Sequence, residues 1–256
     1  IVHPTTGAPF QINRSKIRGE YSEGMLCGED EIGLGTSHEG ILVLNEHAPV
    51  GTPAKRYFKV EEDYCFEIGL TPNRADAASH LGVARDLAAY LNTTIQMPDL
   101  STYVQESESL IIPVQVDDTQ ACPRYCGVSI SGVSVAESPS WLQEKLRTIG
   151  VRPINNIVDV TNYVLHELGQ PLHAFDADTI HGGKVFVKKC TEGTPFTTLD
   201  GIARKLSSTD LMICHAEQAM CMAGVFGGIH SGIKSTTKNI FLRQFNPLLQ
   251  TAAIQL

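Results

Sequence analysis

The stretch VRPINNIVDVTNYVLHELGQPLHAFDAD, residues 151–178, joins a strongly patterned helix to a polar cluster at its exit. Gly169 stands where the C-terminus of a helix favours a left-handed residue. Apolar residues recur ahead of it at the three- and four-residue spacings of one helical face, namely Ile157, Val160, Val164, Leu165 and Leu168. The pattern therefore predicts a core helix that ends at Gly169.

The polar cluster follows Pro171 and contains His173 and Asp176 among apolar neighbours. An imidazole and a carboxylate so close together can do chemistry. A histidine between Leu and Ala is nevertheless more often a core or capping residue, and Asp176 could simply cap the next turn. Thr161 and Asn162, in mid-helix, usually point to solvent or bond the preceding turn. The pattern alone leaves these alternatives open.

The same run resembles the centre of the editing domain in the beta subunit of bacterial phenylalanyl-tRNA synthetase. The shared pattern is long and nearly gapless, and it covers Arg152, Ile154, Ile157 to Val164, Glu167 to Pro171 and His173 to Asp176. The resemblance implies that this part of the chain is a domain that hydrolyses mischarged tyrosyl-tRNA(Phe).

Length and composition are those of a globular protein with one large or two smaller domains: 256 residues, 42% hydrophobic and 19% charged. Because no run approaches the roughly 20 apolar residues of a membrane span and no leader is recognisable, we expect a cytoplasmic protein without membrane contact. The first and last residues, Ile1 and Leu256, predict a segment cut from something longer. The net charge of −8 argues against a general nucleic-acid binder, so any RNA contact must be local.

Seven cysteines are scattered through apolar contexts without C-x-x-C spacing. The nearest two, Cys122 and Cys126, have no histidine cluster beside them, so the sequence predicts no metal site. Reduced structural thiols are expected.

The overall pattern predicts an α+β protein. Residues 1–55 contain short apolar runs between glycines, at 10–12, 18–27 and 40–44, which are typical of the strands of a small barrel. Arg14, Lys16 and Arg18 alternate along one run and are either a solvated strand face or an RNA contact. The motif R-G-E-x-S-E-G-M-L-C, residues 18–27, resembles the end of the OB-like tRNA-binding barrel of the same beta subunit.

Residues 56–100 predict a strand at 66–70 and a helix that opens near Thr71 to Asp76 and ends at Asn92. Its expected buried stripe is Leu81, Ala84, Leu87, Ala88 and Leu91. The entrance sequence N-R-x-D could bind an anion or simply cap the helix. T-P-N-R-A-D resembles the part of the beta subunit that completes its N-terminal domain. Polar residues 101–109 predict the linker.

Residues 110–256 predict a mixed α+β domain, which the resemblance makes an editing domain truncated at its C-terminus. Expected strands lie at 111–116, 125–133, 184–189, 211–214 and 220–226, with a helix from Ser138 to Gly150 and a hairpin turn at 199–202.

Residues 223–232, AGVFGGIHSG, form a second candidate site because dense glycines let the backbone approach a ligand. The loop matches neither the phosphate-loop nor the dinucleotide-loop pattern, and a tight bend is the alternative. It resembles the pocket-lining loop of the editing domain.

The resemblance assigns editing-pocket positions to five residues: Arg152, Thr161, Asn162, His173 and Gly227. It implies that His173 orients the water or the terminal ribose, that Thr161 and Asn162 hydrogen-bond the aminoacyl group, and that Gly227 leaves room for the ring. One position departs from the family pattern. Arg243 stands where the family has a glutamate that accepts the tyrosine hydroxyl, and arginine only donates.

The resemblance also implies the partners, tRNA(Phe) and the alpha subunit, with no DNA. It places ATP and Mg use in the alpha subunit of the parent enzyme, so no cofactor is expected in this segment and the isolated fragment is expected to be inactive in aminoacylation. A non-catalytic scaffold that contacts tRNA and the alpha subunit is the alternative function. A thiol hydrolase using a cysteine with His173 or His215 is a third reading, although no cysteine stands in a nucleophile context.

Overall fold

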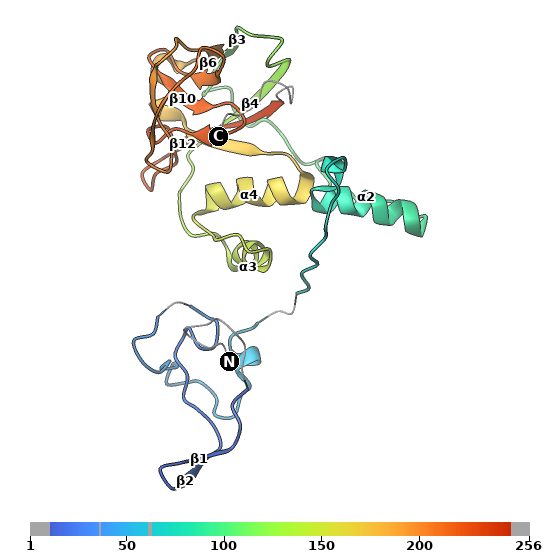
Figure 1. The fold of residues 1–256 in the computed structure, drawn as a ribbon, viewed down its shortest axis with the longest axis vertical. Coiled ribbons are helices and arrows are strands. Elements are labelled where there is room, and N and C mark those ends of the chain that lie inside the picture. Colours follow the sequence, from blue (N-terminus) through green and yellow to red (C-terminus); the bar gives the residue numbers. More distant parts are fainter. Residues whose placement is uncertain (1–10, 36, 61–62, 247–256) are drawn as a thin grey trace. The chain divides into compact units, whose positions relative to one another are not determined.

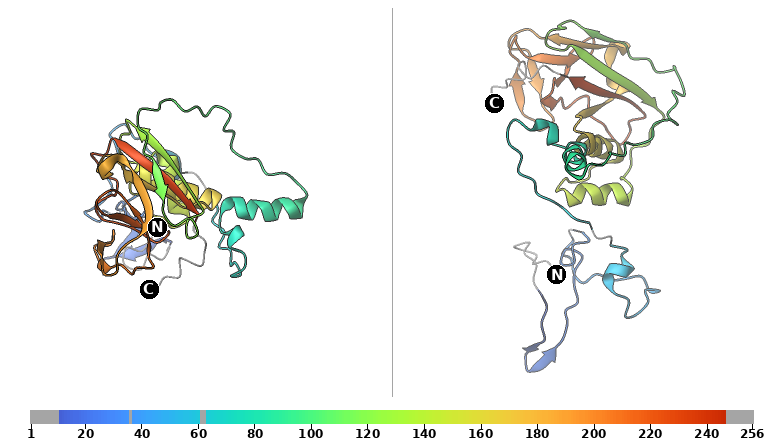
Figure 2. Two further views of the ribbon diagram at one scale, coloured as in Figure 1. Left: turned by 90° about the horizontal axis from the view of Figure 1, so that it is seen from above. Right: turned by 90° about the vertical axis from the view of Figure 1, so that its right-hand side faces the viewer.

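The computed structural model describes residues 11–35, 37–60 and 63–246, which divide into two compact units at residue 63 (Figures 1 and 2). Helices and several separate sheets make the chain an α+β protein, as predicted. The predicted domain boundaries at 55/56 and across 101–109 stay predictions. Among the described helices, none has the length and apolarity that a membrane crossing needs.

The described part of the first unit contains one antiparallel hairpin, β1 (Ser15–Ile17) and β2 (Glu20–Ser22), and the short helix α1 (Ala54–Tyr57). Arg18 has φ 52° and lies in the hairpin turn, so the expected alternation along one strand is wrong at this residue. The strand expected at 40–44 is also wrong. Ile41 and Val43 are exposed there, and no strand in the described part of this unit covers them. The barrel end stays a prediction.

The second unit starts with a 3-10 turn, η1 (Ala75–Ala77), followed by α2 (His80–Leu91). Ser79 caps α2 by accepting a hydrogen bond from the Gly82 amide at 3.0 Å. The helix therefore begins later than predicted. Arg74 is paired with the carboxylates of Asp76 and Asp86 at 3.0 and 2.8 Å, and anion binding by the backbone amides of this segment stays a prediction.

Two further expectations for this segment are wrong. Residues 66–70 form no strand. The predicted buried stripe of α2 is largely open, since Leu87 is 54% and Leu91 63% exposed. The spacing of the apolar residues identified the helix correctly. Among the described elements, the main contacts of α2 are with η1 and α4, and its far half stays exposed.

Helices α3 (Ser140–Thr148) and α4 (Asn156–Leu168) lie on one side of the sheets of this unit (Figures 1 and 2). The side chain of Asn155 caps α4 by accepting hydrogen bonds from the amides of Ile157 and Val158 at 3.1 and 3.0 Å. Gly169 ends α4 with φ 73°, in the left-handed region that glycine adopts without a Cβ clash. The predicted C-terminus of this helix is therefore confirmed.

Two larger sheets and a hairpin complete the unit. The first sheet is antiparallel and has the order β4 (Arg124–Ser131), β12 (Asn239–Asn246), β5 (Leu172–Asp176). The second has the order β11 (Phe226–Gly227), β10 (Ala219–Met222), β9 (Leu211–Cys214), β6 (Val185–Lys189), β3 (Val114–Val116). The hairpin pairs β7 (Pro195–Thr197) with β8 (Ala203–Lys205), as the turn at 199–202 predicted.

The main core brings residues of both sheets together. Phe175 and Phe241 from the three-stranded sheet are buried with Val185, Val187 and Ile213 from the five-stranded sheet. A smaller cluster joins the five-stranded sheet to the β7–β8 hairpin through Phe196, Leu206, Met212 and Cys214.

Replacing Asn155 with alanine is expected to lower the free energy of unfolding by about 1 kcal/mol, because the first-turn amides of α4 lose their acceptor. Urea unfolding of the variant measures this cost. Glu144→Ala, at an exposed position of α3, is the control and should change stability by less than about 0.5 kcal/mol. A loss for Asn155→Ala no larger than that of the control would contradict the capping role.

Candidate functional site

The position of His173 follows from strand alternation and register. On β5 its side chain shares a face with that of Phe175, which is fully buried in the main core. The two rings meet edge to face with centroids 4.6 Å apart. In the antiparallel pairing of β5 with β12, His173 lies directly opposite Arg243. The imidazole and the guanidinium therefore project toward the same side of the sheet.

The electrostatics around His173 favour its neutral form. Burial, and after it the positive charge of Arg243, lower the pKa of His173 to about 4. Arg243 is itself buried and donates a hydrogen bond from Nη2 to Sγ of Cys221 at 3.0 Å. Burial raises the pKa of the Cys221 thiol, which leaves it a poor nucleophile. A histidine that is neutral at pH 7 can accept a hydrogen bond on one nitrogen and donate one from the other.

Gly227 on β11 packs directly against this imidazole. A Cβ on Gly227 would lie 2.9 Å from Cε1 and 3.3 Å from Nε2 of His173, and 2.8 Å from Cδ1 of Leu199. Nε2 of His173 is buried there and makes no hydrogen bond with any residue that the structure describes. Glycine is required at this position because its neighbours occupy the space of a side chain.

The other predicted pocket residues lie on or ahead of α4. Arg152 is exposed in the loop before the helix, and Asn162 is partly buried. Thr161 is buried, and its hydroxyl donates to the carbonyl of Val158 at 2.7 Å, so toward any ligand it can only accept. Within the described ranges, no hydrogen bond joins Thr161 or Asn162 to His173 or Gly227.

Asp176 has a structural role in the described part of the chain. Its carboxylate accepts hydrogen bonds from the amide of Asp178 at 3.1 Å and from the hydroxyl of Thr237 at 2.6 Å. This is the capping alternative left open by the sequence. Asp176 therefore fixes the exit of β5, the strand that carries His173.

Several residues of the cluster gave no clear signal in the sequence. Cys221 and Leu199 come to it from distant segments of the chain. Outside this cluster, the sequence also gave no clear signal for Asp159, a fully buried carboxylate of α4 that accepts hydrogen bonds from Ser138 at 2.5 Å and from the Ile154 amide at 2.8 Å. An acid between two valines on a predicted core helix was the available clue.

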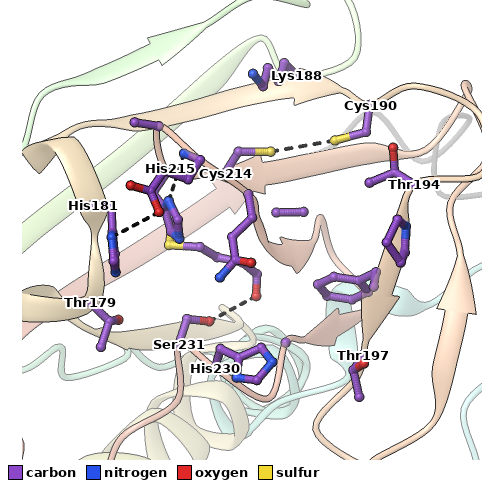
Figure 3. A pocket seen from close by; sticks show the side chains of 18 of the residues that line it. Thr179, His181, Lys188, Cys190, Thr194, Thr197, Cys214, His215, His230 and Ser231 are labelled. Atoms are coloured by element: carbon purple, nitrogen blue, oxygen red, sulfur yellow. Dashed lines mark hydrogen bonds and ion pairs between the residues drawn. The ribbon is translucent and has the colours of Figure 1, made fainter.

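The glycine-rich loop also reaches a cavity of about 600 Å³ (Figure 3). Gly228, His230 and Ser231 of the glycine-rich loop line it, whereas His173 and Gly227 do not. The loop that backs the imidazole therefore also forms a wall of a separate cavity. His215, buried in the same wall, stacks on His181 with ring centroids 4.8 Å apart.

Comparison with known proteins decides the family. The B3/4 domain family matches residues 121–249, half of the chain. The chain belongs to the B3/4 domain family. Residues 121–249, the B3/4 segment, contain α3, α4 and both larger sheets except β3. They also contain the residues around the imidazole: His173, Leu199, Cys221, Gly227 and Arg243.

Relatives extend beyond the B3/4 segment. The phenylalanine–tRNA ligase beta subunit of Bacteroides fragilis is 56% identical over 245 residues, and that of Porphyromonas gingivalis is 54% identical over 248. The matches cover 93% and 94% of this chain but 30% of each relative. The chain is therefore homologous to beta subunits of this ligase and spans less than a third of their length. An N-terminal fragment of the phenylalanyl-tRNA synthetase beta subunit from Pyrococcus horikoshii has a TM-score of 0.42 at 16% identity, covering 70% of this chain and 54% of that fragment.

Proposed function

We propose that this chain is the editing segment of a phenylalanine–tRNA ligase beta subunit and hydrolyses the ester of tyrosine mischarged onto tRNA(Phe). The observation that carries the proposal is the neutral, partly buried imidazole of His173, which packs against the Gly227 backbone. The homology to beta subunits supports it. We include in the proposal tRNA(Phe) and the alpha subunit as partners and the cytoplasm as the location. Aminoacylation with ATP and Mg belongs to the alpha subunit.

The chemistry needs a positioned water more than a protein nucleophile. The ester carbon is already activated, and holding water at it supplies much of the rate. A neutral His173 orients that water or a hydroxyl of the terminal ribose. Thr161, whose hydroxyl proton is committed to Val158, accepts from the ammonium of the amino acid, and Asn162 bonds its carbonyl. Arg152, exposed beside α4, faces the acceptor end of the RNA.

Editing is needed because an apolar pocket for phenylalanine excludes tyrosine poorly. A site built for phenylalanine discriminates against an added hydroxyl by only about two orders of magnitude. The experiment is hydrolysis of tyrosyl-tRNA(Phe) and phenylalanyl-tRNA(Phe) by the whole synthetase that contains this segment. We expect the tyrosyl ester to be hydrolysed faster than the phenylalanyl ester and faster than in buffer. Equal rates for both esters at the level of buffer would refute the function.

One observation favours the alternative, a scaffold for tRNA and the alpha subunit whose pocket no longer edits. Arg243 lies opposite His173, and a guanidinium cannot accept the proton of a phenol. Under this alternative the B3/4 segment serves only to contact tRNA and the alpha subunit, and tyrosine does not bind beside His173.

Arg243→Glu separates the two functions. A carboxylate at this position accepts the phenolic hydrogen bond, so under the editing proposal we expect tyrosine to bind about tenfold more tightly, corresponding to about 1.4 kcal/mol. Calorimetric titration of the chain with tyrosine measures the change. Arg243→Met removes the charge without adding an acceptor and is the control. Tyrosine binding in none of the three proteins would support the scaffold.

A further inference from the structure

Cys190 and Cys214 bring their sulfurs to 3.9 Å from each other in the wall of the cavity (Figure 3). All seven cysteines are free, and no other two cysteine sulfurs in the described ranges make such a contact. Cys214 belongs to the smaller core cluster, and the partly buried Cys190 packs against it. The contact joins segments 24 residues apart in sequence.

The strand register places the two cysteines at different ends of the β6–β9 pairing, because Cys214 lies opposite Phe186 and Cys190 follows Lys189. Cys214 is the last residue of β9, which is hydrogen-bonded to β6 over Phe186 to Lys189. Cys190 directly follows β6 and starts the connection to β7. A disulfide needs a sulfur separation of about 2 Å, so closing the 3.9 Å gap requires the connection after β6 to move toward the end of β9.

The two thiols differ in access. Both line the cavity, but Cys214 is 1% exposed whereas Cys190 is partly exposed. Burial and the neighbouring Cys190 raise the pKa of Cys214 to about 12. An oxidant that enters the cavity therefore meets Cys190 first. Cys214 is placed to react second, as the resolving thiol.

We propose that Cys190 and Cys214 form a reversible redox pair that a peroxide closes to a disulfide. The Cys190 thiolate attacks one peroxide oxygen and the O–O bond breaks, giving a sulfenic acid. The second oxygen takes up the proton that the thiol released and leaves as water. The Cys214 sulfur then attacks the sulfenic sulfur; the S–S bond forms, and the hydroxyl leaves as water with the proton of Cys214. Two thiols and one hydrogen peroxide thus give one disulfide and two waters, and a small dithiol reverses the reaction by exchange.

No alternative use by a metal is indicated: within the described ranges, no group of three His, Cys, Asp or Glu side chains is arranged to hold an ion. The disulfide would tie the β6–β7 connection to the end of β9, at one wall of the cavity. The redox pair is separate from His173 and does not depend on the editing proposal.

The test is to treat the chain with hydrogen peroxide, block the remaining thiols with iodoacetamide and map the peptides by mass spectrometry. We expect a Cys190–Cys214 crosslink that dithiothreitol removes, with the other five cysteines alkylated. Cys126→Ser, at an exposed cysteine, is the matched control and should keep the crosslink. Cys190→Ser should abolish it and leave Cys214 reduced. Recovery of Cys190 and Cys214 as separate alkylated or sulfinic species, or crosslinked to other cysteines, would overturn the proposal.

Discussion

Replacing His173 with alanine is expected to slow hydrolysis of tyrosyl-tRNA(Phe) about 100-fold in the synthetase that contains this segment, because a positioned acid-base group contributes at least that factor. The variant lacks the neutral imidazole, packed on Phe175 and Gly227, that orients water at the ester in the proposed function. Single-turnover deacylation with purified mischarged tRNA measures the effect. It separates loss of chemistry from loss of binding when the tRNA concentration is varied.

Two companion variants make this result interpretable. His166→Asn, on α4 away from the cluster, should keep the rate within about twofold. His173→Gln fills most of the space and retains a hydrogen-bonding group, so it should recover part of the activity if His173 orients water by hydrogen bonding. If His173→Ala hydrolyses the tyrosyl ester at the unaltered rate while folding normally, His173 has no part in the mechanism.

Acidification from pH 7 to pH 4 is expected to cost the folded chain about 3 kcal/mol through His173 alone. The pKa of this residue is lowered in the folded state from 6.5 to about 4. Between these two values the unfolded chain binds a proton that the folded chain does not. Stability is therefore fully present above pH 6.5 and falls as the pH drops toward 4. Urea unfolding at pH 7, 5.5 and 4 measures the slope.

The matched control for this pH dependence is His173→Phe, which keeps an aromatic ring on Phe175 and removes the titrating group. His215, whose pKa is lowered by burial and by His181, titrates in the same direction in both proteins. Carboxylates with lowered pKa values, such as Asp118 and Asp200, also contribute at acid pH in both. The difference between wild type and His173→Phe isolates His173. Parallel curves for the two proteins would show that its proton is not linked to folding.

The local elements of the B3/4 segment could be read from the chain because their signals are local. The sequence predicted Gly169 as the end of α4, which acts through its backbone angle within one helical turn, whereas the cap at Asn155 was not predicted. The turn at Asp200 and Gly201 likewise predicted the β7–β8 hairpin. The nearness of His173 to the glycine-rich loop followed from the family resemblance.

Other features depended on which distant segments pack together. The stripe on α2 has helical spacing, yet Leu87 and Leu91 are exposed because spacing does not reveal what covers a helix. The strand expected at 40–44 failed for the same reason, since a strand needs a partner to complete its hydrogen bonds.

The sequence by itself determined the helix that leads into β5 and its left-handed end at Gly169, and the resemblance to the ligase beta subunit pointed to His173. Only the tertiary structure decided that Arg243 lies opposite His173, that Gly227 packs against its Nε2, and that Cys190 meets Cys214. The physical reason is that each of these contacts joins segments far apart in the chain. Their register is set by the packing of two sheets around one core, which no local pattern encodes.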